Sequence, residues 1–147
     1  MSTSEENKAL VLASYQAFGA GQRDAIAARF APDAERIVPE GNATVVALGQ
    51  TSGFMGRDAI VKYLTEDIRG GLFTGSKVEL LNVVADDRHV VIEQLYEGTV
   101  CNGRPYKAVQ CFIFEMGGGL IRQVRTYFDT ASGFKQIFGD EPPRKLV

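Results

Sequence analysis

Apolar and polar residues alternate through the C-terminal half of the chain, and this alternation predicts three consecutive antiparallel strands. The strand-like runs are His89–Val100, Pro105–Met116 and Leu120–Phe128, which are rich in β-branched and aromatic residues. Asn102-Gly103 separates the first two runs, and Gly117-Gly118-Gly119 separates the last two. Both are turn sequences typical of β-hairpins. We therefore expect a three-stranded meander around which the rest of the chain is arranged.

The N-terminal half has helical periodicity instead. Apolar residues recur at helical spacing across Glu6–Ala20. A second, short helix is expected over Arg23–Phe30, ended by Pro32-Asp33, because proline interrupts a helix. A third is expected over Arg57–Ile68, closed by Gly70-Gly71.

The remaining segments carry weaker patterns. Glu35–Val38 favours a short strand, and Lys77–Ala85 a fourth long strand. Residues 40–56 hold several glycines and predict a loop or irregular hairpin that could cover a pocket, with Thr44–Leu48 as its best strand candidate. Phe134–Phe138 predicts a short helical turn. Helices gathered on one face of an antiparallel sheet make the expected fold class α+β, with about four long strands plus short ones and three N-terminal helices.

The hairpin loops decide which side chains share a face of the sheet. A three-residue loop at 117–119 pairs Gln110 with Thr126, and a three-residue loop at 102–104 pairs Tyr96 with Gln110. A two-residue turn in place of the loop at 102–104 would shift the register of the first hairpin by one residue and exchange the faces. With the preferred loops, one face carries Gln94, Tyr96, Gln110, Phe112, Val124, Thr126 and Phe128, and the other carries Glu93, Leu95, Val109, Cys111, Ile113, Arg125 and Tyr127.

Both faces are largely apolar. We expect the helices to cover the first face, with a pocket between them. We expect the second, outer face to form a homodimer with another copy of the chain, unless loops or the C-terminal tail cover it.

The composition is that of an ordinary globular protein. The chain has 147 residues, 45% of them hydrophobic and 23% charged, with a net charge of −2. We expect one domain over 1–147, with an ordered core of about 6–138. Because the sequence has no long basic runs, we expect neither nucleic acid nor a membrane as a partner. No apolar run reaches the roughly 18 residues of a membrane span, and the acidic N-terminus does not resemble a signal peptide, so we expect a cytoplasmic protein.

The two cysteines, Cys101 and Cys111, fall at a turn and in mid-strand, which should place them too far apart to bond. The chain has one histidine and no close cluster of cysteine and histidine. We therefore expect reduced, packing cysteines, no metal site and no cofactor.

Short motifs along the chain follow the order and spacing of a known superfamily. They are Ala20-Gly21 with Asp24-Ala25-Ile26, Phe30-Ala31-Pro32-Asp33-Ala34, Gly56-Arg57-Asp58-Ala59-Ile60, Asn102-Gly103-Arg104 and Val124-Arg125-Thr126-Tyr127-Phe128-Asp129. Over roughly residues 7–130 the chain resembles the nuclear transport factor 2-like superfamily, which includes SnoaL-like polyketide cyclases, ketosteroid isomerases and limonene epoxide hydrolases. The resemblance implies a cone with a deep pocket between a concave sheet and the helices, without implying one reaction.

The catalytic residues of the ketosteroid isomerases are not retained in this sequence. The resemblance places their general base at Val38, their helix tyrosine at Ser14 beside Tyr15, and their oxyanion aspartate at Gln110. Steroid isomerisation by that route is therefore not expected.

The catalytic residues of the epoxide hydrolases are also replaced. Their arginine and first aspartate fall at Gln94 and Tyr96, and the second carboxylate falls at Thr126. The polyketide cyclases place an acid/base aspartate on this last strand, where Asp129 remains but lies at the strand end or on the outer face.

The expected pocket is rich in hydrogen-bonding groups rather than strong bases. The candidate ligand-binding residues are Ser14, Tyr15, Phe18, Val38, Gln94, Tyr96, Gln110, Phe112, Val124, Thr126 and Phe128. The best catalytic candidates are Tyr96 and Gln110, as donors to an oxyanion, and Glu40, as a base near the pocket mouth. Alternatively, the glutamines and the tyrosine satisfy one another in a packed core, and Glu40 is a solvated loop charge.

Two functions remain open at this stage. One is a cofactor-free enzyme, of isomerase, cyclase or hydrolase type, acting on a hydrophobic oxygenated molecule such as a polyketide, steroid or terpenoid. The other is a non-catalytic ligand-binding or dimerisation module that uses the same pocket. The loss of the relatives' carboxylates favours the second.

Overall fold

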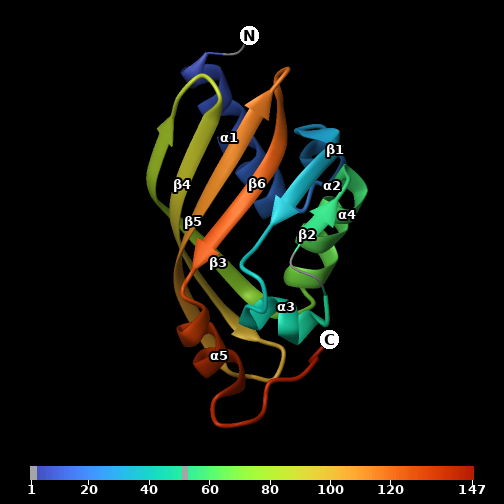
Figure 1. Ribbon diagram of the computed structural model, residues 1–147, viewed down its shortest axis with the longest axis vertical. Coiled ribbons are helices and arrows are strands. Elements are labelled where there is room, and N and C mark those ends of the chain that lie inside the picture. Colours follow the sequence, from blue (N-terminus) through green and yellow to red (C-terminus); the bar gives the residue numbers. More distant parts are fainter. Residues whose placement is uncertain (1–2, 51–52) are drawn as a thin grey trace.

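The fold is a curved six-stranded sheet with helices packed against one face (Figure 1). The computed structural model describes residues 3–50 and 53–147, so the first two residues of the expected loose N-terminus and residues 51–52 of the expected loop lie outside it. The strands are β1 (Phe30–Ile37), β2 (Gly53–Met55), β3 (Phe73–Ala85), β4 (His89–Val100), β5 (Pro105–Gly117) and β6 (Leu120–Phe128). The helices are α1 (Ser4–Gly19), α2 (Arg23–Ala27), α3 (Ala43–Leu48), α4 (Arg57–Lys62), the π-helix η1 (Tyr63–Ile68) and α5 (Thr130–Phe138).

The expected α+β class and the long antiparallel meander are confirmed. The sheet order is β2-β1-β6-β5-β4-β3, and β3 to β6 pair antiparallel with their sequence neighbours. The sheet is not antiparallel throughout, however, because β1 pairs parallel with β6. Since the chain runs from β1 through α3, β2, α4 and η1 before it returns as β3, nothing local fixes the direction in which β1 meets β6.

The second predicted helix is too long, and the first predicted strand is too short. α2 ends at Ala27, and Phe30–Ile37 is already a strand, with Pro32-Asp33 inside it. The pairing of β1 with β6 shifts between Phe30 and Glu35, and β1 pairs with β2 only from Glu35 onward. Proline is tolerated at this irregularity because its missing N–H falls where the ladder is interrupted.

Thr44–Leu48 belongs to helix α3 and not to the predicted strand. Asn42 caps the helix, since its Oδ1 accepts from the backbone N–H groups of Thr44 at 3.0 Å and Val45 at 3.2 Å. Gly49 ends the helix in the left-handed conformation with φ 62°. The cap and the burial of one helix face override the β propensity of the run Thr44-Val45-Val46.

The predicted helical turn near the C-terminus is a longer helix, α5. Asp129 caps it by accepting from the N–H of Ser132 at 3.0 Å. Asp129, the one carboxylate that the motif shares with the cyclases, is therefore occupied with helix capping.

Both hairpins are displaced by two residues from the predicted register. Gln110 lies opposite Phe128 instead of Thr126, and it lies opposite Gln94 instead of Tyr96. The second hairpin turns on Gly118-Gly119 alone, which adopt φ 60° and 75°. A displacement of two residues leaves every side chain on its predicted face, so the expected division of the strands into two faces is correct.

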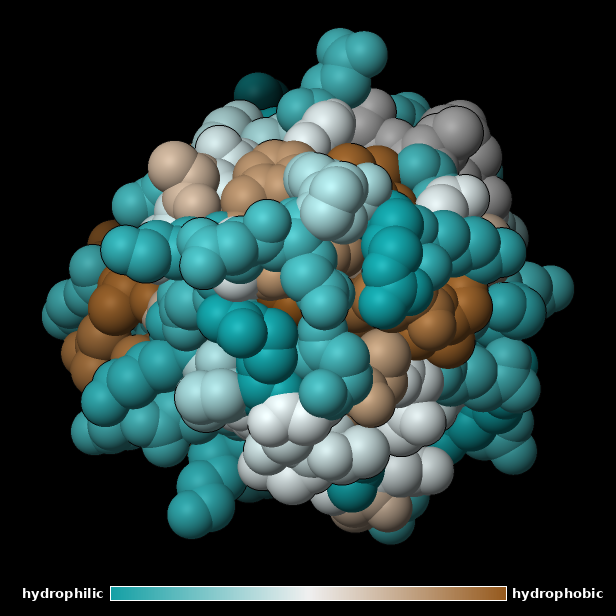
Figure 2. Space-filling view, turned by 90° about the horizontal axis from the view of Figure 1, so that it is seen from below, coloured by the Kyte–Doolittle hydropathy of each residue, from teal (hydrophilic) through white to brown (hydrophobic). Residues whose placement is uncertain are grey.

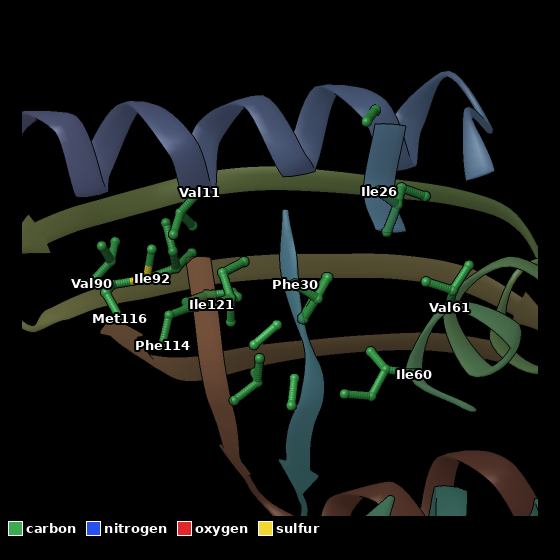
Figure 3. Packing of buried hydrophobic residues seen from close by; sticks show 14 residues of the cluster. Val11, Ile26, Phe30, Ile60, Val61, Val90, Ile92, Phe114, Met116 and Ile121 are labelled. Atoms are coloured by element: carbon green, nitrogen blue, oxygen red, sulfur yellow. The ribbon is translucent and has the colours of Figure 1, made fainter. Parts of the chain in front are cut away.

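The hydrophobic core occupies the space between the helices and the inner face of the sheet. Val11 of α1 lies close to Val90 and Ile92 of β4, and Ile26 and Ile60 approach from α2 and α4 (Figure 3). A second cluster, in which Tyr63, Leu72, Phe73, Tyr96, Tyr106, Ile137 and Phe138 take part, lies under α3 and α5. Seen from that end, the surface is largely hydrophilic with hydrophobic residues in separate groups (Figure 2).

The outer face of the sheet keeps apolar side chains in contact with solvent. Val109 is 54% exposed and Tyr127 51%. The C-terminal tail lies elsewhere, against α3, where the N–H of Leu146 donates to the carbonyl of Ala47 at 2.7 Å.

Cys101 is exposed and Cys111 half-buried, and both are free, as expected. Within the described part of the chain, no helix is both long and apolar enough to cross a membrane.

Candidate ligand-binding site

A cavity of about 130 Å³ lies between the inner face of the sheet and the helices. Its wall is mainly aromatic and aliphatic, contributed by the sheet and by α1, α2, α3, α4 and η1. Val78 of the edge strand β3 belongs to the wall and is 38% exposed, so this strand borders both the cavity and solvent. An apolar hollow with a few polar groups is the usual form of a small-molecule site.

Most of the predicted ligand-binding residues lie around this cavity. Ser14, Tyr15, Phe18, Gln94, Tyr96, Gln110, Phe112, Val124, Thr126 and Phe128 all line it. Val38 is buried but lies outside the cavity wall, beyond the end of β1. Whether the lining residues bind a ligand stays a prediction.

The predicted base, Glu40, is not at the cavity. Its side chain is exposed in the turn after β1, and it is not among the lining residues. Among the described residues, the wall contains no aspartate, glutamate, histidine or lysine. No group of three or more metal-ligating side chains occurs in the described ranges either.

A short hydrogen-bonded row crosses the cavity wall from α1 to β5. The hydroxyl of Tyr15 donates to Oε1 of Gln94 at 2.8 Å, and Nε2 of Gln94 donates to Oε1 of Gln110 at 3.0 Å. The glutamines thus satisfy one another in part, as in the alternative that the sequence leaves open.

Burial raises the pKa of Tyr15 well above its ordinary value, although the positive charge of Arg36 acts in the opposite direction. Tyr15 is therefore a neutral hydroxyl donor at physiological pH.

Tyr96 and Gln110 do not form the predicted pair of donors. Tyr96 lies opposite Ala108, and its hydroxyl is 2.5 Å from Oγ of Ser76. Its ring packs edge-on against Phe73, with 5.3 Å between ring centroids. Burial raises the pKa of Tyr96. The prediction failed because the hairpin register is displaced by two residues, which moves Tyr96 along the strand from Gln110.

Arg36 is the charged side chain among the described cavity residues, and the sequence pattern did not identify it. It lies on β1 beside Val124 of β6, is only 7% exposed and lines the cavity. Its guanidinium carbon lies 4.1 Å from the centroid of the Tyr63 ring, and its Nη1 is buried without a hydrogen-bond partner. Strand parity could have identified it, because side chains two residues apart share a face and Val38 had been placed at the pocket.

Two hydroxyl side chains in the wall differ in their pairing. Thr126 is 2% exposed, and its Oγ1 has no hydrogen-bond partner. Ser14, by contrast, donates to the carbonyl of Val11 at 2.6 Å. Thr126 and Arg36 thus bring unpaired polar atoms to the same cavity from neighbouring strands.

The π-helix η1 supplies Tyr63, Leu64 and Ile68 to the wall. Such segments are rare and are often found beside functional sites. Here η1 places the Tyr63 ring against Arg36.

The family model for the SnoaL-like domain matches residues 11–124. No curated protein sequence matches the chain. Among solved structures, a nuclear transport factor 2-like protein of Burkholderia pseudomallei K96243 has a TM-score of 0.78 at 20% identity, with 93% of this chain and 98% of that chain covered.

Two further structures are similar in fold. TerC, co-crystallised with polyporic acid, has a TM-score of 0.77 at 22% identity and covers 90% of this chain and 98% of its own. An LEH-like epoxide hydrolase of Mycobacterium tuberculosis has a TM-score of 0.68 at 22% identity, with 91% and 90% covered.

Proposed function

Because this chain belongs to the SnoaL-like domain family, we propose that its cavity binds a small, mainly apolar molecule that carries oxygen groups. The observation that carries the proposal is an apolar cavity crossed by the hydrogen-bonded row Tyr15–Gln94–Gln110. Apolar walls favour the body of the ligand, and the few polar groups orient its oxygens. TerC, which shares the fold, was crystallised with a molecule of an oxygenated kind, polyporic acid.

The proposal is tested by a binding screen with a cavity-filling variant. Terpene alcohols, lactones, steroids and hydroxynaphthoquinones are screened by thermal shift, and each binder is confirmed by NMR chemical-shift changes. Val124→Phe places a larger ring in the cavity wall and should abolish binding. Val109→Phe makes the same change on the outer face, where the side chain is 54% exposed, and should leave binding intact.

The result is decided by the comparison of the two variants. Binding that is lost in Val124→Phe and kept in Val109→Phe supports the proposal, provided that circular dichroism shows both variants folded. A panel without a single binder, or binding that Val124→Phe leaves unchanged, contradicts it.

A second candidate function is a cofactor-free isomerase or cyclase. The observation that favours it is the buried guanidinium of Arg36 in the apolar wall, since a preorganised donor stabilises an oxyanion strongly in such surroundings. Because the described wall holds no aspartate, glutamate, histidine or lysine, water in the cavity would have to accept the α-proton of a bound ketone while Arg36 stabilises the enolate. Such an enzyme would exchange that proton with D₂O, which NMR follows directly. Binding without exchange assigns the cavity to ligand binding alone.

A further inference from the structure

Arg36 is a buried positive charge whose donors are incompletely paired. The side chain is 7% exposed, and a guanidinium stays protonated at every pH at which a protein is folded. Its guanidinium carbon lies over the ring of Tyr63, 4.1 Å from the ring centroid, in a cation–π contact. A cation–π contact supplies no hydrogen-bond acceptor in the plane of the guanidinium, and Nη1 is buried without one.

The counter-charge is not supplied by the cavity wall. Within the described residues, no aspartate or glutamate lines the cavity. A buried charge without a partner is strongly unfavourable, whereas a charge-assisted hydrogen bond to an anion is among the strongest polar contacts in proteins. An anion that entered the cavity would therefore remove an existing energetic cost as well as add a contact.

A second unpaired donor lies on the neighbouring strand. Arg36 of β1 is in register with Val124 of β6, and Thr126 is the next residue of β6 on the same face. Its Oγ1 is buried without a partner, like Nη1 of Arg36. Phe112, directly opposite Thr126 on β5, continues the wall with an apolar ring.

We infer that the ligand of this cavity is an organic anion: an apolar, ring-sized body with one carboxylate or acidic enol. Its charged oxygens contact Nη1 of Arg36, and one of them accepts from the hydroxyl of Thr126. The planar fork of arginine suits a planar oxygen acid better than the point charge of lysine would. This inference rests on the proposed function and adds the charge class of the ligand to it.

The test compares acids with amides of the same shape. Benzoate and benzamide, and 2-naphthoate and 2-naphthamide, are titrated into the protein in a calorimeter. The wild type should bind each carboxylate at least about tenfold more tightly than its amide, as expected when one charge-assisted hydrogen bond is gained. Arg36→Met should remove this preference while it retains the binding of the amide.

Arg125→Met is the matched control. It removes the same charge from the outer face, where Arg125 pairs with Glu115 at 3.3 Å, and it should keep the preference for the acid. Thr126→Val should lower carboxylate affinity several-fold without changing amide affinity.

One measurement needs no variant. In the wild type, affinity for the acid should fall as pH drops through the pKa of the free acid, while affinity for the amide stays constant.

The outcomes separate the inference from the proposed function. If no probe binds the wild type, the inference is refuted, and the screen of terpene alcohols, lactones, steroids and hydroxynaphthoquinones decides the proposed function separately. If acid and amide bind equally, or if Arg36→Met weakens both to the same extent, the inference is refuted and the proposed function stands.

Discussion

At the scale of single residues, the cavity combines a permanent cation with hydroxyl groups that resist ionisation. Burial raises the pKa of Tyr15 and of Tyr96 in the cavity wall, and raises that of Tyr106 in the neighbouring core cluster to about 12. Removal from water disfavours the charged form of each phenol. The cavity therefore keeps its donors protonated throughout the physiological range, and its charge comes from Arg36.

These pKa shifts predict a loss of stability at high pH. An unfolded tyrosine releases its proton near pH 10.0, whereas Tyr106 in the folded chain holds it up to about 12. The contribution of the neutral phenol is complete below pH 10.0 and is lost as pH rises from there to about 12. The free energy of unfolding, measured by urea denaturation, should fall by up to about 1.4 kcal/mol per pH unit for each such tyrosine.

Tyr106→Phe should lessen this fall, because the substituted ring has no proton to release. A variant whose stability falls as steeply as that of the wild type between pH 10.0 and about 12 would contradict the assignment.

At the scale of elements, the sequence pattern predicted the strands and turns that depend on residues close together in the chain. The alternation of the C-terminal strands and the glycine turns gave β4 and β6 their observed bounds. The predicted faces of the strands are correct although the predicted register is wrong, because a displacement of two residues keeps each side chain on the same face. α3 was missed because a single cap, Asn42, and burial outweigh β propensity there.

Contacts between distant segments were harder to anticipate. The pairing of β1 with β6 joins residues far apart in sequence, and no local signal gives its direction. Arg36 was overlooked for the same reason: its burial depends on β6 beside it and on Tyr63 of η1 above it. The sequence shows on which face of β1 Arg36 lies, but it does not show which residues of other elements surround it.

The end of η1 predicts a strong effect of one added methyl group. A Cβ at Gly71 would lie 2.3 Å from the carbonyl oxygen of Asp67 and 2.6 Å from that of Glu66, both backbone atoms. Gly71→Ala should therefore destabilise the protein by about 1–3 kcal/mol in urea denaturation. Gly19→Ala is the control, since a Cβ there meets nothing within 4 Å, and it should be neutral or stabilising by up to about 1 kcal/mol. Equal stability of both variants would show that the turn after η1 can shift freely.

At the scale of the whole molecule, the outer face of the sheet is the main apolar surface that the chain leaves uncovered. Val109 and Tyr127 are each more than half exposed there, and the C-terminal tail packs on α3 instead. We propose that a second copy of the chain covers this face. Self-complementary apolar faces favour two-fold association.

The dimer is tested by sedimentation velocity. The wild type should sediment as a dimer, and Val109→Glu as a monomer, because the substitution would bury a carboxylate in an apolar interface. Val147→Glu places the same charge at the C-terminus, where the side chain is 49% exposed, and should leave the dimer intact. A monomeric wild type, or a dimer that survives Val109→Glu, would overturn the proposal.

The two register shifts in β3 bear on how this protein resists aggregation through its sheet edge. β3 is an edge strand of an open sheet, and its pairing with β4 is irregular between Thr74 and Lys77 and again between Leu80 and Asn82. Strand-by-strand growth into fibrils needs an evenly spaced row of backbone donors and acceptors, and such irregularities interrupt it. The edge strand that borders the cavity can thus stay unpaired without offering a template for aggregation.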